Sequence, residues 1–177
     1  MKLVLSAVCC IALGSLAMAA QKKPAAGAPM TDQQFVNFAA QTDMVEANLG
    51  QLAQNVAAGQ SVKDYGQMLV TEHTKDFGQL NAAAQQANLA VPNAIDAQHD
   101  KTLIKPMEKL KGAAFDHRYT QEMIAGHTKA IAVYKKEAAD AQNPGLKSYA
   151  EQALPVLQQH LQGAKDLAKS KSSAKAK

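Results

Sequence analysis

The chain has 177 residues, no tryptophan and only two cysteines, and its formal net charge is +4. Both cysteines, Cys9 and Cys10, lie near the N-terminus, so a chain cleaved behind them has no thiol for nucleophilic catalysis, thiolate metal binding or redox chemistry. The excess of lysine lies at the two ends, whereas acids slightly outnumber bases between Met30 and Ala168, so the folded body is near neutral.

Residues 1–19 have the pattern of a secretory signal peptide. A positively charged start is followed by an apolar run of about 14 residues and by the small-x-small cleavage site Ala17-Met18-Ala19. A membrane anchor would need an apolar run of roughly 20 residues. We therefore expect an exported protein, in the periplasm or at the outer-membrane periphery, that does not span the membrane after cleavage near Ala20.

A single helical domain follows a flexible linker. Residues 20–30 form the linker and are rich in Ala, Lys, Gly and Pro, whereas residues 31–168 are rich in Ala, Gln, Leu and Lys. The composition of the second segment favours helix, and no stretch of it has the alternating pattern of a strand. Its length suits one hydrophobic core.

The first two predicted helices carry inward-facing residues at spacings of three and four. The first begins at Thr31, where Gln34 completes a capping box, and ends at Gly59. The second has Ser61 as its N-cap and fades near Asn88. Their inward positions are Phe35, Phe38, Thr42, Val45, Leu49, Leu52 and Val56, then Tyr65, Leu69, His73, Phe77, Leu80 and Ala84.

A long connection separates these helices from two more. It carries a short amphipathic helix with Leu103, Met107 and Leu110 that ends at Gly112. The third long helix covers about 113–139, and the fourth begins after Asn143-Pro144. Their inward positions are Phe115 or Asp116, Tyr119, Met123, His127, Ala130 and Tyr134, then Leu146, Ala150, Ala153, Leu157, His160, Ala164 and Leu167.

This order of elements predicts an all-α four-helix bundle with a crossover-length connection between its second and third long helices. The direction of the third long helix stays open. Residues 169–177, a run of Ser, Ala and Lys, are expected to form a basic disordered tail that aids solubility. The alternative role for this tail is weak contact with anionic envelope components. It contains no aromatic residue, so specific nucleic-acid binding is not expected.

Three histidines on inward positions are the most informative polar residues. Each lies near the middle of its own helix, and Glu46 lies at a similar height on the first helix. Imidazole and carboxylate groups that converge inside a helix bundle are ligands for transition metals. The candidate metal ligands are Glu46, His73, His127 and His160.

The alternative interpretation is a structural polar layer, which we expect to be the more common reason for such residues. In that case the histidines would hydrogen-bond to polar side chains of the core. The candidate partners are Tyr65, Asp116, Tyr119 and Tyr134. Glu72 is expected to point to the flank of its helix, because adjacent helical residues do not share a face.

Short motifs in all four predicted long helices carry a resemblance to a known family. They are Phe35, Ala39, Met44-Val45-Glu46, Leu49-Gly50, Val62-Lys63, Met68, Glu72-His73, Gly112, Phe115-Asp116, Tyr119, Met123, His127, Leu146-Lys147, Leu154-Pro155 and His160-Leu161. With these residues the chain resembles the bacterial domain-of-unknown-function family 4142, whose members are labelled outer-membrane or exported proteins. The resemblance implies a ferritin-like fold and export, and it implies little about activity.

A di-iron centre does not fit this sequence. Such a centre takes Glu-x-x-His from two helices, but Val70, Ile124 and Leu157 occupy the position three residues before the histidines. No nucleophile is paired with a base either, so we expect a protein that is not an enzyme.

Three hypotheses for the function remain. The expected one is a non-enzymatic envelope protein with a structural His/Glu layer. The first alternative is a bundle that binds one transition metal ion as its cofactor. The second alternative is an envelope stress protein that responds to pH through its buried histidines. The oligomeric state is left open.

Overall fold

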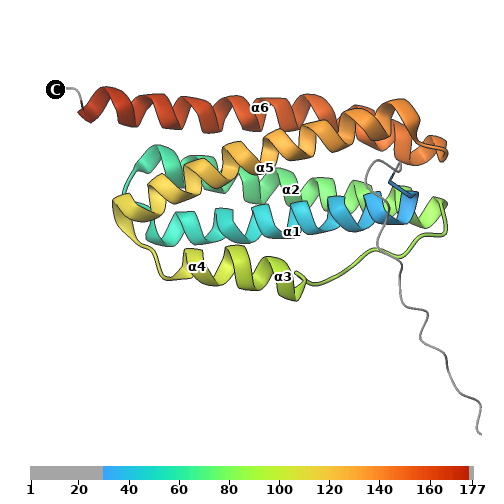
Figure 1. The fold of residues 1–177 in the computed structure, drawn as a ribbon, viewed down its shortest axis with the longest axis horizontal. Coiled ribbons are helices and arrows are strands. Elements are labelled where there is room, and N and C mark those ends of the chain that lie inside the picture. The colour runs from blue at the N-terminus through green and yellow to red at the C-terminus, as the bar shows by residue number, and fades with distance from the viewer. Residues whose placement is uncertain (1–29, 176–177) are drawn as a thin grey trace, which may run out of the picture.

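The computed structural model describes residues 30–175, and the side chains as far as residue 170. The predicted signal peptide and residues 20–29 of the linker lie outside the described residues. The described residues contain no strand. Four long helices form the body (Figure 1): α1 (Asp32–Val56), α2 (Gln60–Gln86), α5 (Gly112–Asp140) and α6 (Pro144–Lys175). The prediction of an all-α four-helix bundle is confirmed.

The long connection sets the direction of the third long helix, which the sequence left open. It contains α3 (Ala97–His99), the π-helix η1 (Asp100–Ile104) and α4 (Lys105–Glu108), and it runs back along α1 (Figure 1). As a result α5 begins beside the turn between α1 and α2, where Asp116 accepts hydrogen bonds from the backbone N–H groups of Ala58 and Gly59, both at 3.0 Å. Helix α5 is therefore parallel to α2 and antiparallel to α1, which is the order of a ferritin-like bundle with one crossover.

Two glutamines hold the long connection against α1. Gln33 donates to the carbonyl of Ala90 at 2.7 Å and accepts from its N–H at 3.2 Å. Gln41 donates to the carbonyl of Ala94 and accepts from the N–H of Asp96, both at 2.9 Å. Each side chain amide thus replaces a backbone partner that this irregular segment lacks.

The helix ends follow the predicted capping residues in two of three cases. Thr31 and Gln34 form the capping box of α1, and Asn143 accepts from the N–H groups of Gly145 and Leu146. The prediction of Ser61 as the cap of α2 is wrong, because α2 begins at Gln60 with Gly59 as its N-cap. The carboxylate of Asp116 from α5 satisfies the backbone at this turn instead.

The short helix of the connection also differs from its prediction. It ends at Glu108 rather than at Gly112, which has a positive φ of 61° and is the first residue of α5. A left-handed φ is easily adopted only by glycine, so Gly112 belongs to the turn. The π turn of η1 precedes Pro106, whose ring removes a helical hydrogen bond.

The core consists of two hydrophobic clusters with the three histidines between them. Phe35, Leu80, Tyr134 and Leu157 belong to one cluster. Leu49, Leu69, Tyr119, Met123 and Ala164 belong to the other. Along each of α2, α5 and α6, the chain passes from one cluster through a histidine to the other, so the histidines form one polar layer across the bundle.

The buried face of α1 is rotated from the predicted one. Phe38, Thr42, Leu52 and Val56 are only partly buried, whereas smaller or polar residues are buried. These buried residues are Ala39, Ala40, Asp43, Glu46, Gly50 and Ala53. A β-carbon on Gly66 would lie 2.8 Å from the carbonyl oxygen of Gly50, so α1 and α2 pack backbone to backbone. Bulky residues cannot occupy such a contact.

Helix α6 continues to Lys175 and so covers most of the segment 169–177 that we expected to be disordered. Alanine and lysine have high helix propensity, which lets a helix already formed in the bundle extend past its last core residue. No helix among the described residues has the length and apolar character needed to cross a membrane.

Candidate metal centre

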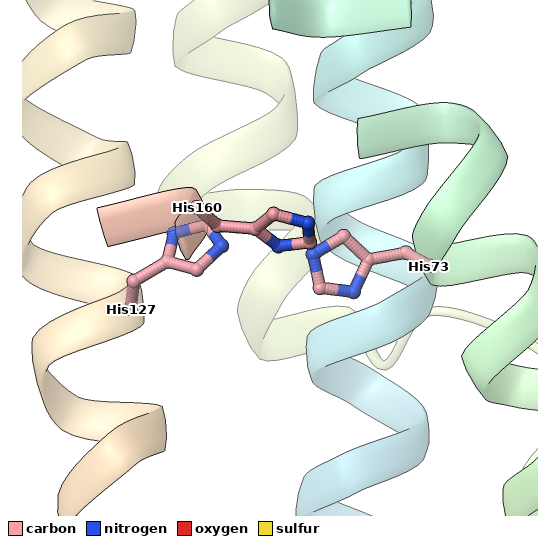
Figure 2. A group of neighbouring side chains, drawn as sticks. All are labelled: His73, His127 and His160. Atoms are coloured by element: carbon pink, nitrogen blue, oxygen red, sulfur yellow. The ribbon is translucent and has the colours of Figure 1, made fainter. Parts of the chain in front are cut away.

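The three predicted histidines meet in the middle of the bundle. His73 on α2, His127 on α5 and His160 on α6 are 1%, 0% and 1% exposed. Their ring centroids are separated by 5.8 Å between His73 and His127, 5.0 Å between His73 and His160, and 5.2 Å between His127 and His160. Figure 2 shows the rings converging from three separate helices.

One nitrogen of each ring is engaged in a hydrogen bond directed away from the other two rings. His73 Nδ1 lies 2.9 Å from Oδ1 of Asp43, and His160 Nε2 lies 2.6 Å from Oε2 of Glu72. His127 Nδ1 lies 2.8 Å from the carbonyl oxygen of Met123. Because a carbonyl only accepts, Nδ1 of His127 carries the proton and Nε2 has a free lone pair.

The second nitrogen of each ring is buried and has no hydrogen-bond partner among the described residues. These atoms are Nε2 of His73, Nε2 of His127 and Nδ1 of His160. One ligand atom from each histidine lies within 4.8 Å of the others. A buried polar atom without a partner costs about 1–3 kcal/mol. Three such nitrogens facing one region, each held by an outer hydrogen bond, form the arrangement of a histidine metal site.

The protonation states also suit metal binding. Burial lowers the pKa of His73 well below its usual value, and the neighbouring histidines lower it further. Burial lowers the pKa of His127 to about 4. Burial lowers the pKa of His160 as well, although Glu72 opposes that shift. The three imidazoles are therefore neutral at pH 7, so none of the rings carries the second proton that would compete with a metal ion.

Glu46 lies beside this group and is not part of it. Its Oε1 is 3.7 Å from Nδ1 of His127, the nitrogen that already bonds to Met123. Burial raises the pKa of Glu46 to about 8, with a further contribution from Glu122. The carboxyl packs over Gly126, where an added β-carbon would lie 2.8 Å from Oε1. Glu46 is thus a protonated neighbour of His127 at pH 7.

The four predicted hydrogen-bond partners do not bond to the histidine rings. Tyr65 donates to the backbone carbonyl of His160 at 2.9 Å, and Tyr134 bonds to the hydroxyl of Tyr149 at 3.1 Å. The hydroxyl of Tyr119 has no hydrogen-bond partner among the described residues, and Asp116 binds the turn between α1 and α2.

The residues that do hold the rings were missed. Asp43 lies one turn before Glu46 on the buried face of α1, where small and polar residues give no hydrophobic pattern. Glu72 does lie on the flank of α2, but α6 packs there and brings His160 to it. Asp76, one turn further on, accepts from Tyr149 at 2.7 Å and helps to raise the pKa of Asp43, behind the effect of burial.

Comparison with curated proteins gives no match. Among solved structures, the chain is similar to CopM in the Cu(I)-bound form, with a TM-score of 0.66 and 14% identity over 79% of this chain and 96% of that chain. It is also similar to CopM in the Ag-bound form (TM-score 0.61, 15% identity, 79% and 96% covered) and in the Cu(II)-bound form (0.58, 14%, 79% and 97%). At these identities the likeness shows a shared helical-bundle fold. The family model for the domain of unknown function DUF4142 matches residues 16–167, so the chain belongs to that family.

Proposed function

We propose that this protein binds one copper ion, in the Cu(I) state, through His73, His127 and His160. The observation that carries the proposal is the set of three buried, neutral ring nitrogens without partners, one from each of three helices. A layer that served structure alone would be expected to pair these atoms with each other or with hydroxyl groups.

The donor set favours copper among the metals that imidazole binds. Neutral nitrogen donors suit copper, zinc, iron and nickel. Structural zinc takes four protein ligands, and catalytic zinc takes three with water in the fourth position. The group here offers three, and Glu46 would have to lose its proton before it could join. Cu(I) accepts three nitrogen donors and needs no fourth. The similar structures are the Cu(I)-, Ag- and Cu(II)-bound forms of CopM, which gives independent support.

The burial of the site favours holding the ion over turning over a substrate. The hollow beside His73 and His160 has a volume of about 10 Å³, which is at the lower limit for one water molecule. A substrate therefore has no room next to the ion. In an exported protein, such a site would store or scavenge copper.

The test is the metal content and the copper affinity of the mature protein. Protein purified without chelators or an affinity tag is analysed by mass spectrometry, and the metal-free protein is then titrated anaerobically with Cu(I) against a chromogenic chelator. We expect one equivalent of copper, and a loss of affinity of more than about 100-fold in His127→Ala. His117→Ala is the control, because this histidine is exposed on the same helix.

Two results would change the conclusion. A folded wild-type protein that takes up neither Cu(I) nor zinc would leave the histidines as a structural polar layer, a role that their bonds to Asp43, Met123 and Glu72 would also serve. Stoichiometric zinc with no copper would keep the site and replace the metal.

A further inference from the structure

The three histidines differ in how close their outer hydrogen bonds lie to solvent. The side chain of Asp43, which bonds to His73, is 1% exposed, and His127 bonds to the backbone of its own helix. Glu72, which bonds to His160, is 39% exposed. Among these outer contacts, the pair of His160 and Glu72 is the one that reaches the surface.

A small hollow lies at the same place, in the wall between α2 and α6. It is lined by Glu72, His73 and Asp76 from α2, and by Val156, Leu157 and His160 from α6. Two of the three proposed ligands are therefore in its wall. The larger cavity of about 840 Å³ lies near Met30 and Val133, and no histidine lines it.

The polar groups that line the hollow differ in their exposure. Its wall carries the partly exposed carboxylate of Glu72 and the buried ring of His160, whose Nδ1 has no partner among the described residues. Carboxylates at the mouth of a narrow passage raise the local concentration of cations and their rate of association. With about 10 Å³ of space, the passage admits an ion only after its water shell has been removed, so a protein oxygen at the mouth has to replace that water.

Helix α6 has a weak point in the wall of this hollow. Pro155 lies inside the helix, immediately before Val156 and Leu157. Its ring removes the N–H that would bond to the carbonyl of Glu151. A helix bends most readily where its hydrogen-bond ladder is interrupted. The turn of α6 that carries Val156 and Leu157, and so closes the hollow, is therefore the turn whose displacement requires the least free energy.

We infer that copper enters and leaves the histidine site between α2 and α6, with Glu72 as the first protein group that contacts the ion. Glu72 gives up its hydrogen bond to His160 when the ion arrives and restores it once the ion has passed inward to the three ring nitrogens. This route rests on the proposed function, because it requires that the histidines bind copper.

The test measures how fast Cu(I), supplied as its acetonitrile complex under anaerobic conditions, enters the metal-free protein. The chain has four tyrosines and no tryptophan, and Tyr65 bonds to the backbone of His160, so tyrosine fluorescence in a stopped-flow instrument reports the uptake. Glu72→Gln keeps the size of the side chain and an oxygen for His160. We expect its association rate at low salt to fall by about tenfold. Glu151→Gln loses the same charge nine residues from His160, on the opposite side of α6, and should keep the wild-type rate.

A second variant tests the passage without changing charge. Val156→Phe fills the hollow. We expect the rates of copper uptake and release both to fall while their ratio is retained. Release is measured by trapping the ion with an excess of a chromogenic Cu(I) chelator. Val133→Phe, in the wall of the larger cavity, is its control. Wild-type rates in both Glu72→Gln and Val156→Phe would overturn the route and leave the copper site standing. A wild-type protein that takes up no Cu(I) would overturn the proposed function and the route together.

Discussion

At the scale of the residue, the site depends on which nitrogen of each ring is engaged. The hydrogen bond of His127 to Met123 stays within one turn of α5, so the helix itself sets the ring orientation and leaves Nε2 facing the other histidines. His73 and His160 instead rely on carboxyl groups from α1 and α2. Outer bonds of this kind orient metal ligands and raise their basicity, which explains why acidic residues surround a group of neutral imidazoles.

Glu46 should give the bundle a pH dependence of its own. Its pKa is raised to about 8 in the folded protein from the ordinary value of 4.5, so the folded state keeps a proton that the unfolded state has lost. A raised pKa contributes stability at low pH that disappears as pH rises. Between about pH 6.5 and 8 we expect Glu46 alone to lower the free energy of unfolding by roughly 1–2 kcal/mol. The histidines act against this fall near pH 6.5, because there they are partly protonated in the unfolded chain and neutral in the folded protein.

Urea unfolding at the two pH values checks this expectation. Glu46→Gln should show a smaller fall in stability than the wild type, and Glu108→Gln, an exposed residue in the connection, should match the wild type. An equal fall in the wild type and in Glu46→Gln would show that Glu46 is already ionised at pH 6.5. Below pH 6.5 the lowered pKa values of the histidines reduce the free energy of unfolding as the pH falls, because only the unfolded chain then binds protons at these residues.

At the scale of the element, the contact between α1 and α2 sets the position of Asp43 against His73. Gly50 and Gly66 make this contact, and a β-carbon on Gly66 would lie 2.8 Å from the carbonyl of Gly50 and 2.9 Å from the β-carbon of Ala53. Gly66→Ala should therefore destabilise the protein by about 1–3 kcal/mol, even though alanine is the better helix former.

Gly78→Ala is the matched control for that change. Gly78 also lies in α2, but apart from its chain neighbours and the backbone of its own helix, no described atom lies within 4 Å of the position of its β-carbon. We expect this substitution to stabilise the protein by about 0.5–1 kcal/mol through helix propensity alone. If both alanine variants were equally stabilised in urea unfolding, the two helices could not be packed as closely as described.

Periodicity in the sequence predicted some helices better than others, for physical reasons. On α5 and α6 the inward positions are marked by large residues such as Tyr119 and Leu157, so the buried face could be read directly. On α1 the closest contact is made by Gly50 and small neighbours, which carry no hydrophobic signal, and Asp43 was missed with them. The bond from Glu72 to His160 joins residues 88 positions apart, and a single sequence does not specify such a contact.

At the scale of the whole molecule, the histidine layer is where the two hydrophobic clusters meet. His73, His127 and His160 come from three helices, and Asp43 and Glu72 connect them to α1 and to the surface of α2. Among the described residues, three buried ring nitrogens at this junction have no hydrogen-bond partner. A bound ion would satisfy all three at once and would join α2, α5 and α6 by coordination, so metal binding and global stability should be coupled.

Thermal unfolding with and without copper tests that coupling. A ligand that binds only the folded state at about 100 times its dissociation constant adds roughly 2.7 kcal/mol of stability. For a domain of this size we expect a rise in Tm of about 5–10 °C. His73→Ala should lose this rise, whereas His117→Ala should keep it, since His117 lies outside the layer. Stoichiometric Cu(I) binding with no change in Tm would mean that the ion binds the unfolded chain equally well. The three histidine nitrogens come together only when the helices are packed, so this result would exclude the histidine layer as the binding site.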